Sequence, residues 1–142
     1  MNQIGTVDTL NGILALACAR LQDSYQESFA GFTAGELHNG MHSLAIEQRF
    51  QEQLRHLDFR RSSDGWYSKA LDTQISLSMT FGLAHFTGQY EITTNRRVAN
   101  SQISRIRKEF GPEVITQLEQ MAGALIKATP RYKEFCPIPN LF

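Results

Sequence analysis

The stretch 92-ITTNRRVANSQISRIRKEF-110 has two faces of different chemistry when it is drawn as an α-helix. Each residue advances by about 100°, and the apolar side chains then collect on one narrow stripe: Ile92, Ala99, Ile103, Ile106 and Phe110. The opposite face carries Arg97, Ser101, Ser104, Arg105 and Lys108. The stretch therefore predicts a helix that buries one face and presents positive charge and hydroxyl groups on the other.

The residues after this stretch predict a second helix that folds back on the first. Gly111 is suited to a left-handed C-terminal cap, and Pro112 to the first turn of a new helix. Apolar residues recur at helical spacing from Pro112 to about Ala128. After Pro130 the segment RYKEFCPIPNLF shows no helical period, so we interpret residues 131–142 as an extended tail.

Two helices are predicted in the first part of the chain. Apolar residues recur at steps of three and four from about Val7 to Phe29. Thr33 and Glu36 have the spacing of a capping box, which indicates a helix that begins there and reaches about Leu57. Its apolar stripe is broken, so this helix either packs against two neighbours or bends near Gly40.

The middle of the chain permits two interpretations. Residues 59–65 form a polar connection that can supply a helix cap from Ser62, Ser63 or Asp64. In residues 66–87 the apolar side chains satisfy both a helical and an alternating strand pattern. We favour a largely buried helix, because the pattern extends beyond a usual strand length; whether residues 71–92 form a helix or a β-hairpin stays open. Thr93 or Thr94 is expected to cap the helix that follows.

These patterns predict an all-α fold, a single-domain bundle of about five helices over residues 1–130 with an extended tail at 131–142. A chain of 142 residues with 42% hydrophobic residues can bury a core without metal or disulfide staples. Cys18 lies in an apolar helical run and is expected to be a buried free thiol. A bridge from Cys18 to Cys136 would require export of the chain.

The net charge is zero, but the charges are unevenly distributed. Residues 1–59 hold three basic and seven acidic residues, whereas residues 60–110 hold eight basic and four acidic ones. Such a dipole could hold two copies together or attract an acidic partner. No uninterrupted apolar run is long enough for a membrane span. The N-terminus lacks the basic and apolar regions of a secretory signal, so a cytoplasmic location is expected.

The basic helix face is the first candidate site. Arginine and serine bind phosphate oxygens, and arginine also pairs with carboxylates. The face therefore has three interpretations: a nucleic-acid contact, a contact to an acidic partner, or an ordinary solvated surface. Its members are Arg96, Arg97, Ser101, Arg105, Arg107 and Lys108.

His38 and His42 form an HxxxH pair one helical turn apart, and they are the second candidate site. Two imidazoles at this spacing can hold a metal ion, but a protein site needs at least three ligands. The sequence contains no HExxH motif, phosphate loop or dinucleotide fingerprint. No cofactor is expected, and a metal-dependent enzyme is the third of our functional hypotheses.

The aromatic residues are the third feature. Several of the nine phenylalanines fall in connections or in the tail, where they either plug the ends of the bundle or pack on a partner. In residues 131–142 the candidates are Tyr132, Phe135 and Phe142. We therefore favour a non-catalytic regulatory or adaptor protein that binds another protein or itself as a homo-oligomer. The alternative is a nucleic-acid-binding accessory protein that uses the helix face 96–108.

Overall fold

Helices dominate the computed structural model, which describes residues 4–25 and 30–132. Within these residues lie six α-helices, two short 3-10 helices (η) and two sheets of two antiparallel strands each. In chain order the elements are α1 (Thr6–Tyr25), α2 (Ala34–Ala45), α3 (Gln51–Leu54), η1 (Arg55–Leu57), β1 (Arg60–Ser62), β2 (Gly65–Tyr67), α4 (Lys69–Thr80), β3 (His85–Phe86), β4 (Ile92–Thr93), α5 (Arg96–Phe110), α6 (Pro112–Ala128) and η2 (Pro130–Tyr132). The predicted all-α fold is confirmed.

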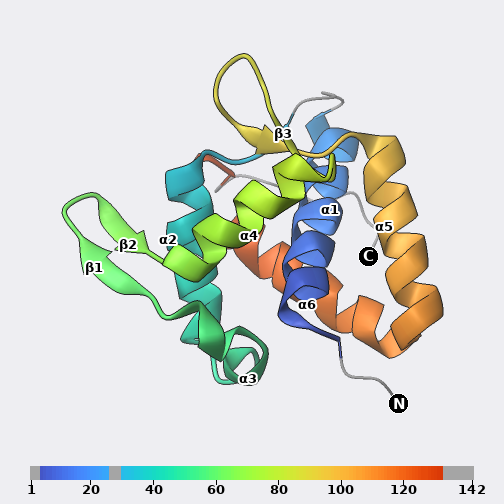
Figure 1. Ribbon diagram of the computed structural model, residues 1–142, viewed down its shortest axis with the longest axis horizontal. Coiled ribbons are helices and arrows are strands. Elements are labelled where there is room, and N and C mark those ends of the chain that lie inside the picture. Colours follow the sequence, from blue (N-terminus) through green and yellow to red (C-terminus); the bar gives the residue numbers. More distant parts are fainter. Residues whose placement is uncertain (1–3, 26–29, 133–142) are drawn as a thin grey trace.

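Helix α1 is the centre of the bundle and packs against both α5 and α6 (Figure 1). Ile13, Ala17 and Leu21 on α1 are almost completely buried. A Cβ atom on Gly12 would lie 2.7 Å from a methyl carbon of Leu118 on α6. The lack of a side chain at Gly12 therefore allows α1 and α6 to cross closely.

The α5–α6 hairpin is present where it was predicted, but α5 begins at Arg96, so Ile92 of the predicted apolar stripe lies on β4. Gly111 ends α5, with ψ 167° rather than the value of a left-handed cap. Gly111 has φ +99°, a conformation that residues with a side chain rarely adopt, and Pro112 begins α6. The expected caps, Thr93 and Thr94, are wrong, because both side chains are buried below the start of α5. Asn95 caps α5 instead, and its side chain accepts a hydrogen bond of 2.9 Å from the backbone of Val98.

The single helix predicted up to Leu57 is wrong. The Thr33–Glu36 capping box is present, but α2 ends at Ala45 and a turn leads into the short helices α3 and η1. The apolar stripe of the predicted helix is broken because its two parts lie on these separate elements. Gly40 does not bend α2; it lies against Leu125 of α6, where a Cβ atom would be 2.5 Å from a methyl carbon.

The polar connection at residues 59–65 is a hairpin, in which β1 pairs with β2 antiparallel. Ser68, rather than Ser62, Ser63 or Asp64, caps the next helix by accepting a hydrogen bond from the backbone of Leu71. In Figure 1 this hairpin projects from the side of α2, on the opposite side of the molecule from α5.

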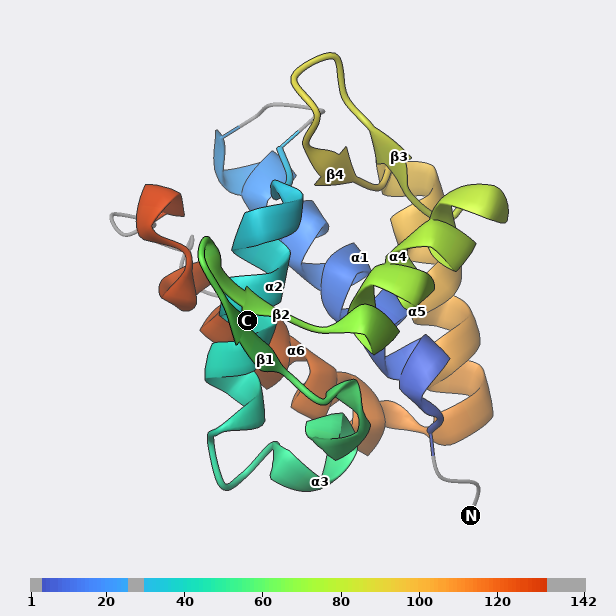
Figure 2. The ribbon, with the colours of Figure 1, turned by 60° about the vertical axis from the view of Figure 1, so that its left-hand side comes forward.

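Both interpretations of residues 66–92 apply to parts of the segment. Helix α4 covers only Lys69–Thr80, and it is followed by the β3–β4 hairpin, in which His85 pairs with Thr93 and Phe86 with Ile92. The hairpin lies beyond the last turn of α4 (Figure 1 and Figure 2). Of the side chains on α4, only Leu71 and Ser78 are buried, so the prediction of a largely buried helix is wrong.

Candidate interaction surfaces

Helix α5 holds the predicted basic face, and its inner side is fixed by Ala99, Ile106 and Phe110, which are buried. The six predicted site residues of the basic face are all exposed. The structure divides them into two groups according to whether they bind an acid on α1.

Arg96 and Arg105 lie at the two edges of the face and are bound to α1. A guanidinium nitrogen of Arg96 lies 2.5 Å from a carboxylate oxygen of Asp23, and one of Arg105 lies 2.5 Å from Asp8. Arg105 also pairs with Glu109 at 2.9 Å. Hydrogen bonding to Asp8 raises the pKa of the Arg105 guanidinium above its ordinary value. These two arginines join α5 to α1, and a contact of either with a partner stays a prediction.

The centre of the face is formed by Arg97, Ser101, Ser104 and Lys108, which we call the α5 stripe. The four residues follow one another at steps of four, three and four, so they lie in one row along the helix. Arg107 lies beside this row. Within the described residues, the side chains of Arg97, Arg107 and Lys108 form no hydrogen bond or ion pair.

The basic residues of the β1–β2 hairpin do not extend this surface. Arg60 pairs with Asp58 at 3.4 Å, and the guanidinium of Arg61 lies over the ring of Trp66. Because the hairpin and α5 lie on opposite sides of the molecule (Figure 1), the two groups of charges form no continuous positive patch.

His38 and His42 support the β1–β2 hairpin. The ring of His38 stacks on Tyr67, and the ring of His42 stacks on Trp66 with centroids 3.8 Å apart. The Nδ1 atom of His38 accepts a hydrogen bond of 3.1 Å from the backbone N–H of Ser68, so that lone pair is not available to a metal. In the parts of the chain that are described, no three or more His, Cys, Asp or Glu side chains lie close enough together to hold a metal ion.

The environment of both histidines disfavours their charged forms. Burial lowers the pKa of His38, although Asp72 opposes this effect. Burial also lowers the pKa of His42, and the positive charge of Arg61 lowers it further. At neutral pH both imidazoles are therefore neutral, which suits their stacking and the bond to Ser68.

The beginning of the predicted tail is fastened to the body of the protein. Tyr132 is buried, and its hydroxyl donates a hydrogen bond of 2.5 Å to the backbone oxygen of Gly31. Arg131 pairs with Glu36 at 2.8 Å and also with Glu91. Tyr132 therefore packs inside the protein rather than on a partner as predicted. Phe135 and Phe142, the other two tail candidates, lie outside the described residues, as does Cys136.

Cys18 is a free, fully buried thiol, as the sequence predicts. Burial raises the pKa of this thiol to about 11. The nucleophilic form of cysteine is the thiolate, so Cys18 is unreactive at neutral pH.

The α4 and β3–β4 region exposes four apolar side chains, of which all but Tyr90 belong to the helix that was predicted to be largely buried. Leu77 and Phe81 lie one turn apart at the end of α4, Phe86 lies on β3, and Tyr90 lies in the turn between β3 and β4. Their exposed fractions are 40%, 72%, 53% and 80%. We call these four residues the apolar end.

One signal in the sequence marks this region. Residues 73–90 contain no Asp, Glu, Lys or Arg, which is unusual for eighteen residues that include an exposed helix face. The pattern of apolar residues fits a buried helix and an amphipathic one equally well. The lack of charge is the only local indication that these side chains meet something other than water.

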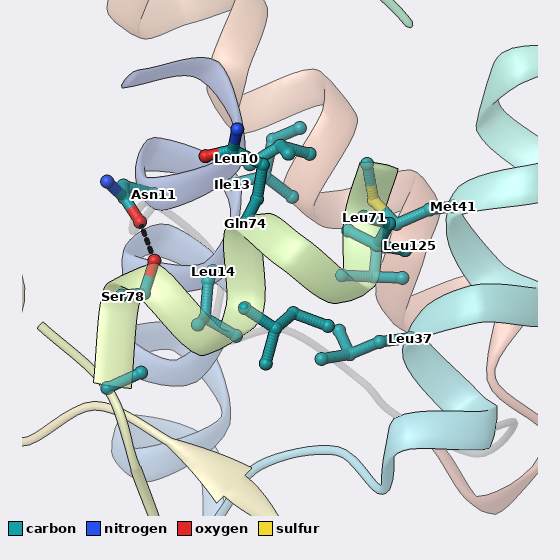
Figure 3. A pocket seen from close by; sticks show the side chains of 12 residues that line it. Leu10, Asn11, Ile13, Leu14, Leu37, Met41, Leu71, Gln74, Ser78 and Leu125 are labelled. Carbon is teal, nitrogen blue, oxygen red and sulfur yellow. Dashed lines mark hydrogen bonds between the residues drawn. The ribbon is translucent and has the colours of Figure 1, made fainter. Parts of the chain in front are cut away.

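A small apolar cavity lies under α4, between α1, α2 and α6 (Figure 3). Its volume is about 30 Å³, and its walls include Leu10, Leu37 and Met41. A polar pair lies at its edge, where the Ser78 hydroxyl donates a hydrogen bond of 2.6 Å to the side-chain oxygen of Asn11. A cavity of this size has room for one or two water molecules and not for a substrate.

A wider, open groove of about 720 Å³ follows α6. Arg20, Arg49 and Lys127 line it together with Glu47 and Glu119. Arg49 pairs with Glu47 at 3.1 Å, so the two signs of charge are interspersed along this groove. It therefore attracts neither anions nor cations selectively.

Comparison with protein-family models, with curated protein sequences and with solved structures found no match for this chain. Among the described residues, no helix combines the length and the apolar character that crossing a membrane requires.

Proposed function

We propose that this protein is a non-catalytic regulatory or adaptor protein of the cytoplasm that associates with a second copy of itself through the apolar end. The observation that carries the proposal is the exposure of four large apolar side chains on the end of α4 and on the β3–β4 hairpin that follows it. Exposed apolar surfaces of this kind mark sites of protein association.

A second copy is the partner that fits this surface best. In a two-fold symmetric dimer the same surface of each copy meets itself, so any net charge on it would face a like charge. Residues 73–90 carry no full charge, so self-pairing meets no electrostatic repulsion. A charged partner would find no opposite charge in this segment to recognise.

The backbone at Tyr90 supports the same proposal. Tyr90 has φ +60°, in the left-handed region that a bulky residue adopts only at a cost of about 1–3 kcal/mol. The turn is held by the Thr87 hydroxyl, which accepts hydrogen bonds of 3.2 Å from the backbone N–H groups of Gln89 and Glu91. The ring of Tyr90 is exposed in this strained conformation. Burial of the ring in a dimer would offset the conformational cost.

The non-catalytic part of the proposal is supported by the interior. The cavity under α4 admits only one or two waters, the Cys18 thiol is protonated, and His38 and His42 are committed to the hairpin. The Cys18 thiol is therefore unreactive, and the two histidines have structural partners in the fold.

The test is the molar mass of the full chain in solution, measured by light scattering after size-exclusion chromatography. The wild type is expected to be a dimer and Phe81→Asp a monomer with unchanged helical content. Ile46→Asp is the matched control, because Ile46 is equally apolar and 64% exposed but lies at the C-cap of α2, away from the apolar end.

Three outcomes would overturn the proposal. The first is a wild type that stays monomeric at about 100-fold above typical cytosolic concentrations, where even weak dimers form. The second is an equal effect of Phe81→Asp and Ile46→Asp. The third is a dimer that Phe81→Asp leaves intact and that deletion of residues 133–142 dissociates, which would place the interface on the tail.

A further inference from the structure

We infer that the α5 stripe, together with Arg107, binds the phosphate backbone of a nucleic-acid duplex without reading its sequence. This site goes beyond self-association and rests on a different helix. It gives the proposed binding protein a second partner.

The order of side chains along the stripe matches a backbone contact. Arg97 and Lys108 lie at the two ends, eleven residues apart, which corresponds to about 16 Å along an α-helix. Ser101 and Ser104 lie between them, and their short side chains leave room for a strand to approach the helix. Cations at both ends and hydroxyl donors in the middle are the groups that bind phosphate oxygens.

Ion pairs at the edges of the face neutralise the carboxylates that would otherwise repel phosphate. Asp8 and Asp23 on α1 border the face, and they are paired with Arg105 and Arg96 at 2.5 Å. Glu109, the only acid on α5, is also paired with Arg105. The charges of Arg97, Arg107 and Lys108 are therefore not compensated by their surroundings within the described chain.

The chemistry of the face favours a duplex over the other possible partners. Protein interfaces depend on buried aromatic or large apolar side chains, and the outward face of α5 has none. Proteins that hold single strands stack the bases on aromatic side chains, which are also missing from this face. A duplex presents its phosphates outward and needs neither feature.

The site is tested with the full chain and a fluorescein-labelled DNA duplex of about 20 base pairs, followed by fluorescence anisotropy between about 50 and 200 mM salt. Three released counterions predict a plot of log K against log salt with a slope of about −2.7. The variant Arg97→Glu with Lys108→Glu is expected to bind at least about ten-fold more weakly and to lower the slope by about 2.

The matched control is Arg55→Glu with Arg60→Glu, which changes the net charge by the same amount. Both residues are exposed, and they lie beside or on the β1–β2 hairpin, on the opposite side of the molecule. The control is expected to keep the wild-type affinity to within about two-fold, because long-range charge is screened at this salt concentration.

Three results would overturn the inference. They are the absence of binding at about 50 mM salt, an equal loss in the control, and competition by polyglutamate as effective as by unlabelled duplex, which would assign the face to acidic protein. Phe81→Asp separates the two proposals: a monomer that keeps its affinity for the duplex retains this site whether or not the protein self-associates.

Discussion

Helices α4 and α5 both meet solvent, but only the end of α4 exposes large apolar side chains. Helix α5 buries Ile106 and Phe110 and exposes arginine, lysine and serine. Helix α4 buries the hydroxyl of Ser78, which needs Asn11 as its partner, and exposes Leu77, with Phe81 at its C-cap. The outer face of α5 is polar or charged throughout, whereas that of α4 carries no large apolar side chain apart from Leu77 and the C-cap residue Phe81. Helix α5 is therefore part of the stable body, and under our proposal the end of α4 faces a second copy.

The largest expected difference between the two helices is in what each contributes to folding. Ile106 on α5 has no exposed surface, so Ile106→Ala is expected to lower the free energy of unfolding by about 2–5 kcal/mol. Leu77 on α4 is 40% exposed, and Leu77→Ala is expected to change it by no more than about 0.5 kcal/mol.

Both variants are measured by urea denaturation in the Phe81→Asp background, so that association does not contribute to the result. The two helices differ as we describe only if Ile106→Ala is the more costly change by at least about 1.5 kcal/mol. Similar losses would mean that α4 is as firmly packed as α5.

This difference shows which parts of the fold the sequence predicts. Helices α5 and α6 have an apolar stripe on one side, so the same residues that avoid water also pack into the core. Helix α1 has apolar residues at helical spacing and is buried on nearly every side. The capping box at Thr33 and the Gly111–Pro112 junction are local signals, and both are present in the structure. Local periodicity and local hydrogen bonding are sufficient for these elements.

The remaining features depend on contacts between residues far apart in the chain. The ion pairs that fasten α5 join Arg105 to Asp8 and Arg96 to Asp23, residues 97 and 73 positions apart. No sequence pattern shows which arginines of a basic face are bound in this way. The same holds for α4, whose Leu77 and Phe81 satisfy a buried pattern although no element of the described chain covers them.

The next expected effect concerns Tyr90, the residue of the apolar end that has a positive φ. Tyr90→Gly should raise the free energy of unfolding of the monomer by about 1 kcal/mol, because glycine adopts positive φ without a steric penalty. The same change removes the exposed ring and should weaken self-association.

Tyr90→Ala is the control for this variant, since it removes the ring but keeps the strain. Both variants are expected to shift the dimer toward monomer in light scattering, and only Tyr90→Gly should melt at a higher temperature than the wild-type monomer. If Tyr90→Gly were the less stable of the two, the left-handed conformation of Tyr90 would carry no cost.

The smallest expected effect is a pH dependence that reaches α4 and leaves α5 unchanged. His38 accepts a hydrogen bond from the backbone of Ser68, the N-cap of α4, and burial lowers the pKa of this imidazole below its ordinary value of 6.5. A group whose pKa is lowered on folding stabilises the fold fully above its unfolded pKa, and this contribution is lost as the pH falls from about 6.5 through the folded value. Protonation at Nδ1 would also remove the acceptor for Ser68 N–H.

Amide hydrogen exchange, corrected for its intrinsic pH dependence, should therefore show α4 losing protection between pH of about 7.5 and 5.5 while α5 keeps it. His38→Gln retains a side-chain acceptor that does not titrate, so it should abolish the selective loss in α4. A parallel loss of protection in α4 and α5, or a loss in α4 that His38→Gln leaves unchanged, would show that α4 is not held through His38.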